Sequence, residues 1–309
     1  MTKSISIVTT MYRSKNYLER FVALCEEALK EIHCTDYEII MVNDGSPDDS
    51  LQKALELQQN HPNIKVVELS RNFGHHYALM AGIETTEKDL VFTIDCDLEI
   101  PPTALVQFVK KYNETPDIDV VYGVQTKRKG NFVERVGGSV FYFLFKKIGG
   151  IQLPKNILTE NLMSREYILA LREMGDKSLF LAGMFHWVGF RQMPLELGKG
   201  QREEKSTYTF GKRLNLALMA ITSFSSYPLI LLLRMGVFIT IVSFSIAIGF
   251  VIYKLFNPTF VLTGFTSLIV AILMSLGIIV FSIGVLGLYL DRIFTQTKDR
   301  PRYIIRKIY

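Results

Sequence analysis

Cysteine is scarce in this chain of 309 residues: only Cys25, Cys34 and Cys96 occur, and they are widely spaced. The absence of a CxxC pair argues against a structural zinc site, and so few cysteines exclude a disulfide scaffold and favour a reducing compartment. Charge of one sign is also scarce. With 35 basic and 30 acidic residues, the net charge of +5 is low for a nucleic-acid binder. A hydrophobic content of 49% excludes a disordered chain.

Charge is absent from two long stretches near the C-terminus. Met235 to Tyr253 is a run of 19 uncharged residues, and Phe265 to Leu290 is a run of 26. Each exceeds the roughly 18 residues that a membrane-spanning helix needs. Two buried core helices are the alternative, but a soluble core helix of this length normally keeps a polar face. The connection is short and contains Asn257-Pro258. The pattern therefore predicts an antiparallel transmembrane hairpin.

The basic residues around this hairpin predict its orientation. The loop carries only Lys254, whereas Arg234 precedes the first run and six basic residues follow the second. These six are Arg292, Lys298, Arg300, Arg302, Arg306 and Lys307. By the positive-inside rule both chain ends are cytoplasmic. The N-terminus lacks the apolar core of a signal peptide. We expect a multi-pass protein of the inner (plasma) membrane.

The resulting domain division has three parts. Residues 1–225 form a cytoplasmic domain, residues 229–290 hold two transmembrane helices at about 235–253 and 265–290, and residues 291–309 form a basic cytoplasmic tail. Basic residues that include Arg128 and Arg135 precede the aromatic run Val140–Phe145. This composition predicts a juxtamembrane amphipathic helix near 136–148, and a second is expected near 211–226. A solvated face beside a core helix is the alternative for the first.

Short β-rich runs alternate with helical segments through the first 125 residues. The expected strands are residues 4–10, 37–42, 64–69, 90–94 and 119–124, and the expected helices are residues 15–31, about 48–60, 77–85 and 101–112. This alternation, with nearly continuous apolar strands, predicts an α/β fold in which a mostly parallel sheet carries helices on both faces. Ligands bind at the carboxyl ends of the strands in such sheets.

Acidic residues follow two of these strands. Asp95-Cys96-Asp97 ends the run FTIDCD, and alternation along an extended chain directs both carboxylates to one side. A hard divalent cation bridged to a substrate diphosphate would relieve their repulsion, and Glu99 is an additional candidate ligand. Such a pair also occurs in ordinary loops. Asp44 follows the second strand and either accepts hydrogen bonds from a base or ribose or caps the turn at Gly45.

Two adjacent histidines, His75 and His76, open a helix after the third expected strand. Neighbouring residues in a helix point about 100° apart, so the two rings cannot readily share one metal ion. Helix capping or contacts to a donor substrate explain them better.

Several motifs occur in one order along the chain. They are Asp44-Gly45-Ser46, Asp95-Cys96-Asp97, Lys205-Ser206-Thr207-Tyr208, Phe224-Ser225 with Pro228-Leu229, Gly287 to Leu290, and Arg300 to Ile305. Together they resemble the family 2 glycosyltransferases of the GT-A fold. The similarity is greatest to the polyprenyl-phosphate branch, which includes dolichol-phosphate mannose synthase and bactoprenol glucosyltransferases. The resemblance covers nearly the whole chain.

The resemblance implies a membrane-bound enzyme of the cell envelope. The reaction would be inverting transfer of a sugar from a nucleotide sugar to polyprenyl (undecaprenyl) phosphate at the cytoplasmic face. The implied donor contacts are Thr9, Thr10, Asp44, Asp95, Arg202 and Lys205. Arg128, Arg135 and Ser139 would bind the acceptor phosphate. Asp95, Asp97 and Glu99 would hold Mg²⁺ or Mn²⁺, and Asp97 and Glu160 are the catalytic candidates.

The chain departs from this branch where relatives carry Asp-Phe-Arg, because here the residues are Thr159-Glu160-Asn161. Glu160 would replace the acidic group from one position away. A phosphate acceptor, with a second pKa near about 6, is largely ionised at neutral pH and tolerates a missing base. Two alternatives stay open, a glycan or glycolipid hydroxyl acceptor and a non-catalytic scaffold. Association between copies through the hairpin is also open, and no nucleic-acid partner is expected.

Overall fold

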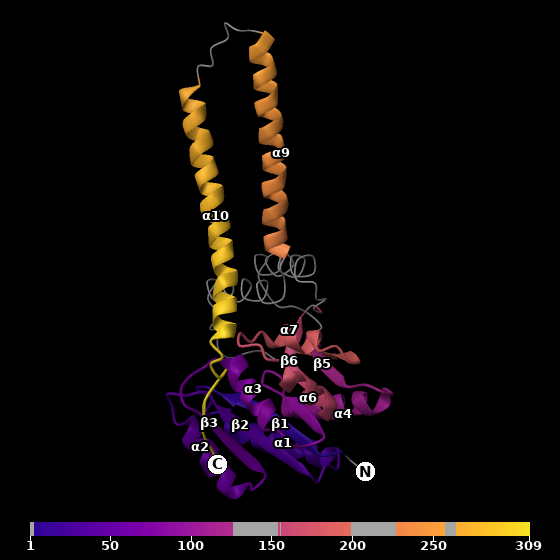
Figure 1. Ribbon diagram of the computed structural model, residues 1–309. Coiled ribbons are helices and arrows are strands. Elements are labelled where there is room, and N and C mark those ends of the chain that lie inside the picture. The colour runs from indigo at the N-terminus through magenta and orange to yellow at the C-terminus, as the bar shows by residue number, and fades with distance from the viewer. Residues whose placement is uncertain (1–2, 126–153, 155, 199–226, 257–263) are drawn as a thin grey trace.

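The computed structural model describes residues 3–125, 154, 156–198, 227–256 and 264–309. Within these residues, eight strands form one sheet in the order β7-β5-β6-β4-β1-β2-β3-β8. Helices cover both faces of the sheet, and two long helices extend away from it (Figure 1). The sheet of the α/β domain and the apolar hairpin are therefore both present, as the sequence predicted.

The centre of the sheet is parallel. It contains β4 (Leu90–Thr93), β1 (Ile5–Met11), β2 (Tyr37–Asn43) and β3 (Ile64–Leu69). These strands are nearly continuous apolar runs because both of their faces are covered by helices. Parallel pairing joins β1 to β2, β1 to β4 and β2 to β3, so β4, β1 and β2 end at the same edge.

The second half of the sheet mixes directions. It contains β5 (Val120–Gln125), β6 (Ile157–Ser164) and β7 (Gln192–Leu197). β6 runs antiparallel to both β4 and β5, whereas β7 runs parallel to β5. Because β6 is antiparallel to β4, the start of β6 lies beside the end of β4, and Asn161 pairs with Thr93.

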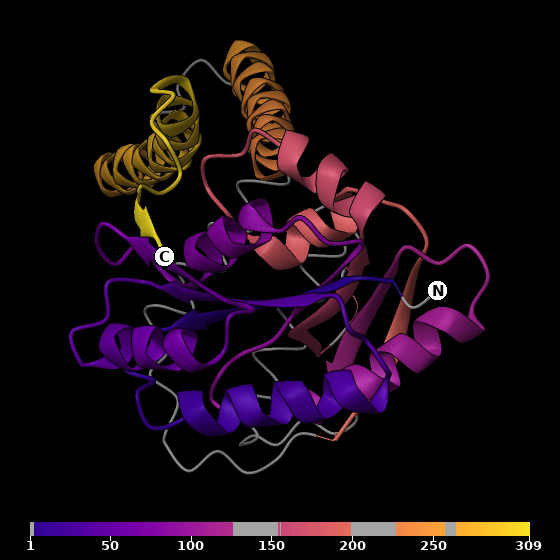
Figure 2. The same ribbon diagram turned by 90° about the horizontal axis from the view of Figure 1, so that it is seen from below.

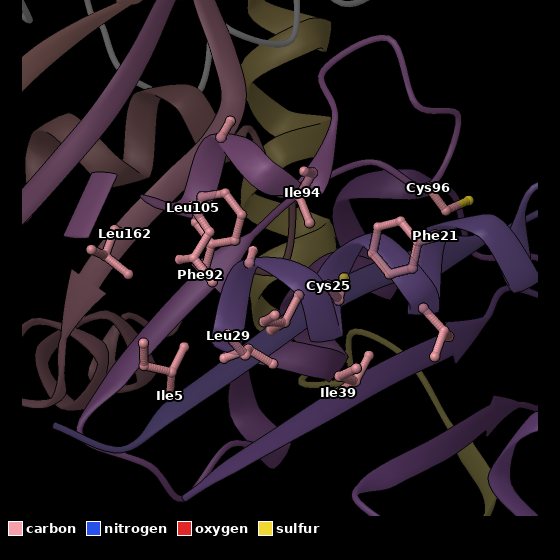
Figure 3. Packing of buried hydrophobic residues seen from close by; sticks show 14 of the residues in the cluster. Ile5, Phe21, Cys25, Leu29, Ile39, Phe92, Ile94, Cys96, Leu105 and Leu162 are labelled. Atoms are coloured by element: carbon pink, nitrogen blue, oxygen red, sulfur yellow. The ribbon is translucent and has the colours of Figure 1, made fainter. Parts of the chain in front are cut away.

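Two buried clusters hold helices against the two faces (Figure 2). On one face lie α1 (Leu18–Glu31), α2 (Ser50–Asn60), a 3₁₀ turn at Pro102–Ala104 and α4 (Leu105–Glu114). Phe21, Cys25 and Leu29 of α1 point toward Ile39 and Phe92 of the strands (Figure 3). The other face carries α3 (His75–Thr85), α6 (Arg165–Glu173) and α7 (Leu181–Trp187).

The C-terminal part contains α9 (Tyr227–Phe256) and α10 (Phe265–Thr297). Windows of these helices, Tyr227–Ile246 and Met274–Thr297, have mean hydropathies of 2.3 and 1.9 with none of the window buried, so both are long and apolar enough to cross a membrane. At 1.5 Å per residue α10 is about 50 Å long, more than the roughly 30 Å of a bilayer core. A helix of this length would extend past such a core, and the last turns of α10 contact the α/β domain.

The last residues differ from the tail that the sequence indicated. β8 (Ile305–Ile308) pairs antiparallel with β3 and becomes the edge strand of the sheet. Side chains reinforce this pairing, because Glu68 accepts from Arg306 at 3.1 Å and from Tyr309 at 3.0 Å. The helices expected near 136–148 and 211–226 lie outside the described residues. A domain ending at residue 225 would thus omit one strand of its own sheet.

Candidate active site

A cavity of about 490 Å³ opens at the edge where β1 and β4 end. Its walls come from the loops after these strands, the first turns of α3 and α7, and the start of β6. The polar residues that line it are Thr10, Tyr12, Ser14, His75, His76, Asp95, Asp97, Glu99 and Thr159. The site thus lies at the carboxyl edge, where ligands bind in open α/β sheets.

Asp95 and Asp97 both line this cavity. Between them, the Cys96 thiol is buried and donates to the Thr10 carbonyl at 3.1 Å, and burial raises its pKa to about 12. Cys96 therefore anchors the segment. The next residues turn sharply: Leu98 has φ +60°, and Asp97 Oδ1 accepts from the Glu99 amide at 3.1 Å. This turn brings Glu99 to the same cavity.

The acidic residues fit a divalent cation that shares its coordination with a substrate. In the described part of the chain, no group of three or more His, Cys, Asp and Glu side chains is arranged to hold a metal by itself. Mg²⁺ needs fewer protein ligands than that, because it is usually bound by one or two carboxylates together with substrate phosphates and water. The Asp95 and Asp97 carboxylates supply such a pair.

His75 lies at the site, and of the two explanations that the sequence offered for it, its contacts agree with a place near a donor substrate rather than with helix capping. Its Nδ1 lies 3.1 Å from Thr10 Oγ1, and its Nε2 lies 3.7 Å from Asp95 Oδ1. The ring therefore bridges the end of β1 and the candidate cation site. The available signal was the position of His75 at the start of a helix that follows a parallel strand. His76 instead bonds the Leu179 carbonyl at 3.1 Å, and burial lowers its pKa.

Asp44 is held by the protein itself. Its Oδ1 accepts from the Phe73 amide at 2.7 Å, and its Oδ2 accepts from the Gly74 amide at 2.9 Å and from Asn72 Nδ2 at 3.1 Å. The residue is 3% exposed, and burial raises its pKa against the opposing effect of the two amides. The next residue is Gly45, with φ +58°. Only glycine fits there without strain, because a Cβ would lie 2.5 Å from the Asn72 nitrogen. Asp44 therefore fixes the loop that leads into α3.

The two threonines at the end of β1 are placed differently. Thr10 lines the cavity, whereas Thr9 is fully buried and its hydroxyl has no hydrogen-bond partner among the described residues. Successive residues of a strand face opposite sides, so only one of the two faces this cavity.

Glu160 is 4% exposed and is not among the residues that line the cavity. Its neighbour Thr159 does line it, and Asn161 is buried with its Nδ2 donating to the Thr159 carbonyl at 2.8 Å. The other candidate residues lie outside the described residues. They are Arg128, Arg135, Ser139, Arg202 and Lys205.

Another cavity, of about 570 Å³, contains none of the candidate residues. Its lining includes Lys3, Asp117 and Arg191, and Arg191 is paired with Asp117 at 3.0 Å. The candidate residues that line a cavity are thus found at the carboxyl edge of the sheet.

Comparison with known proteins identifies the family. The family model described as glycosyl transferase family 2 matches residues 6–172, more than half of the chain. This chain belongs to glycosyl transferase family 2. The match spans β1 to α6, and so includes Asp44, the Asp95–Asp97 segment and Glu160.

Relatives of this family 2 glycosyltransferase match it over nearly its full length. An uncharacterized glycosyltransferase of Synechocystis, sll0501, is 35% identical over 100% of this chain and 96% of its own. The prophage-derived bactoprenol glucosyl transferase of Shigella flexneri is 31% identical over 98% of this chain and 97% of its own. Among solved structures, the mannosyltransferase PcManGT of Pyrobaculum calidifontis has a TM-score of 0.49 at 14% identity, covering 97% of this chain and 89% of that one. The family assignment rests on the sequence matches.

Proposed function

We propose that this glycosyltransferase transfers a sugar, with inversion, from a nucleotide sugar to polyprenyl phosphate at the cytoplasmic face of a membrane. The observation that carries the proposal is the similarity to bactoprenol glucosyl transferases over 98% of the chain, because it extends through the apolar hairpin and the C-terminal strand. A lipid acceptor also explains the two apolar helices, because they would bring the α/β domain to the membrane that holds the acceptor.

The donor would occupy the cavity at the carboxyl edge. Asp95 and Asp97, with Glu99 beside them, would hold Mg²⁺ or Mn²⁺, and this cation would neutralise the diphosphate as it leaves. Thr10 lines the same cavity, whereas Thr9 and Asp44 are buried. We assign Asp44 to the donor site through the loop at 72–74, which it holds. Arg202 and Lys205 stay candidates for closing over the diphosphate.

In the proposed reaction an oxygen of the acceptor phosphate attacks C1 of the sugar, and the bond from C1 to the diphosphate breaks. A phosphate monoester is mostly dianionic at neutral pH, so the attacking oxygen carries no proton that must be removed. This reduces the demand on a catalytic base, the role in which Glu160 would replace the acidic group of the relatives. Arg128, Arg135 and Ser139 are the proposed contacts to the acceptor phosphate.

The proposed topology follows the positive-inside rule, with both chain ends and the α/β domain in the cytoplasm. The docking of β8 onto β3 agrees with this proposal, because a strand that follows α10 then belongs to the same sheet as strands that precede α9. Association between copies stays a prediction.

The test is a transfer assay with the full-length protein in detergent. A panel of labelled nucleotide sugars is supplied with undecaprenyl phosphate and Mg²⁺ or Mn²⁺, and products are extracted into organic solvent. The proposal expects label from one donor in the organic phase, and loss of that signal with EDTA. Donor hydrolysis without a lipid product would move the acceptor to a glycan or glycolipid hydroxyl. No turnover of any donor would favour a non-catalytic scaffold.

A further inference from the structure

The last turns of α10 are bonded to the backbone of a loop in the α/β domain. Gln296 makes both bonds through its amide: Oε1 accepts from the Lys177 amide at 3.0 Å, and Nε2 donates to the Gly175 carbonyl at 2.9 Å. Arg292 adds a bond to Ser178 Oγ at 3.3 Å. The apolar helix is therefore joined to one specific segment, residues 175–179, which we name the docking loop.

The docking loop is bonded on its other side to the first turn of α3. The Lys177 carbonyl accepts from the Tyr77 hydroxyl at 3.2 Å, and the Leu179 carbonyl accepts from His76 Nδ1 at 3.1 Å. Lys177 is thus bonded to α10 through its amide and to α3 through its carbonyl. A shift of Gln296 would move this residue and the hydroxyl of Tyr77 together.

The first turn of α3 is also part of the candidate active site. His75 precedes His76 and contacts both Thr10 and Asp95. The chain that follows the docking loop enters α7, whose Leu181 and Phe185 line the same cavity. The docking loop therefore touches the cavity walls through two elements, α3 and α7.

The end of α10 is also held by the residues that follow it. Asp299 pairs with Lys177 Nζ at 2.7 Å, Arg302 donates to Glu84 Oε1 at 2.9 Å, and Tyr303 donates to Glu84 Oε2. Glu84 lies in the last turn of α3. α10 and the segment after it are therefore connected to both ends of α3. A shift of α10 along its axis would consequently move α3 as well.

We propose that Gln296 is a positioning residue for the donor site. By holding the docking loop it fixes the first turn of α3, and with it the His75 ring against Thr10 and Asp95. The membrane helix then does more than anchor the domain, because its cytoplasmic end sets the geometry in which the donor binds. The inference rests on the proposed function, since it assigns donor binding to this cavity.

The test compares Gln296→Ala with Thr297→Ala in the full-length protein in detergent. Thr297 is the matched control, because its hydroxyl bonds the Phe294 carbonyl of its own helix. Two readouts are made: hydrogen exchange of the amides at 74–79 and 175–181, and binding of a nucleoside diphosphate with Mn²⁺. For Gln296→Ala we expect faster exchange in both segments and donor binding weakened roughly three- to tenfold, as for the loss of one or two hydrogen bonds. The control should match the wild type.

A third variant separates positioning from general stability. Gln296→Glu keeps an acceptor for the Lys177 amide but sets a carboxylate oxygen against the Gly175 carbonyl, so both exchange and donor affinity should be at least as impaired as in Gln296→Ala, while the unfolding midpoint of the α/β domain stays that of the wild type. Unchanged exchange at 74–79 in Gln296→Ala would overturn the coupling. Faster exchange with unchanged donor affinity would overturn the positioning role. If the wild type binds no nucleoside diphosphate, the proposed function fails and the positioning role with it, while the exchange data still decide whether α10 and α3 are coupled.

Discussion

Asp44 and the Asp95–Asp97 pair follow two strands that flank β1, yet the fold uses them differently. The Asp44 carboxylate accepts hydrogen bonds from the loop at 72–74, and the residue is buried from solvent. Asp95 and Asp97 face the cavity, while the residue between them is the one that is buried. Asp44 thus has a structural role, whereas the role that we propose for Asp95 and Asp97 is in binding. The Asp44 carboxylate accepts from three groups of the loop at 72–74, whereas Asp97 accepts from the Glu99 amide of its own turn and still lines the cavity.

The same contrast occurs within one turn of α3. His76 is satisfied by the Leu179 carbonyl, whereas His75 contacts Thr10 and Asp95 at the cavity. Both residues line the cavity, but with roughly 100° between successive helix residues His76 bonds the docking loop while His75 contacts Asp95. The comparison therefore distinguishes a side chain that holds a neighbouring loop from a side chain that contacts the candidate cation site.

The largest effect should come from Asp97→Asn. Loss of one carboxylate of the pair should lower kcat/KM by roughly 100-fold or more, because metal stabilisation of the leaving group is worth several kcal/mol. The thermal unfolding midpoint should stay that of the wild type. Glu114→Gln, at the end of α4, is the control for loss of an exposed charge. Near-normal turnover in Asp97→Asn would remove this residue from the cation site.

Asp44→Asn should act mainly on stability. The new amide group would face backbone N–H donors of Phe73 or Gly74, and an unsatisfied buried donor costs about 1–3 kcal/mol. We expect a lower midpoint in thermal unfolding, with a smaller loss of kcat/KM than in Asp97→Asn. Asp48→Asn is the comparison, because Asp48 bonds Ser46 and Ser50 at a more exposed position. A stable Asp44→Asn protein that lost donor binding would instead make Asp44 a direct substrate contact.

His75→Gln and His76→Gln should separate the two roles in α3. The His75 variant should weaken Mn²⁺-dependent donor binding about 10-fold, in the range measured when partners of metal ligands are replaced. The His76 variant should lower the unfolding midpoint, because the Leu179 carbonyl loses its present partner. Equal effects of the two substitutions on donor binding would contradict the distinction.

His186 is another histidine that the fold buries, and its replacement should have the smallest effect of these substitutions. Its ring lies edge-on to Tyr122 at 5.2 Å, neither ring nitrogen has a hydrogen-bond partner in the part of the chain that the structure describes, and burial lowers its pKa. A base with a depressed folded pKa stabilises the fold above its unfolded value of about 6.5, and this contribution is lost as the pH falls. His186→Phe should be at least as stable as the wild type at pH 8, and its advantage should grow as the pH falls below about 6.5. A pH-independent difference would contradict this, because it would mean that His186 has the same pKa in the folded and unfolded states.

Local sequence patterns predicted much of the fold. The strand expected at 64–69 matches β3, and the strand expected at 37–42 is one residue shorter than β2, because continuous apolar runs specify buried strands. β8 was missed because its charged Arg306 and Lys307 do not form an apolar run, and its partner β3 lies far away in the sequence.

How far the candidate site could be predicted depended on whether its residues lie close together in the sequence. The cavity position of Asp95 and Asp97 followed from the end of a parallel strand, which is a local signal. The bonds of Asp44 to residues 72–74 and the contact of His75 with Asp95 join segments that only the folded sheet brings together. The docking of Gln296 on residues 175 and 177 is of the same kind.

The most direct test of this account is calorimetric titration of a nucleoside diphosphate into the full-length protein, with and without Mn²⁺. Wild type, Asp97→Asn and Asp44→Asn are compared below the unfolding range of all three. The account predicts Mn²⁺-dependent binding in the wild type, its loss in Asp97→Asn, and only a modest loss in Asp44→Asn. Undiminished binding to Asp97→Asn, or loss confined to Asp44→Asn, would contradict it.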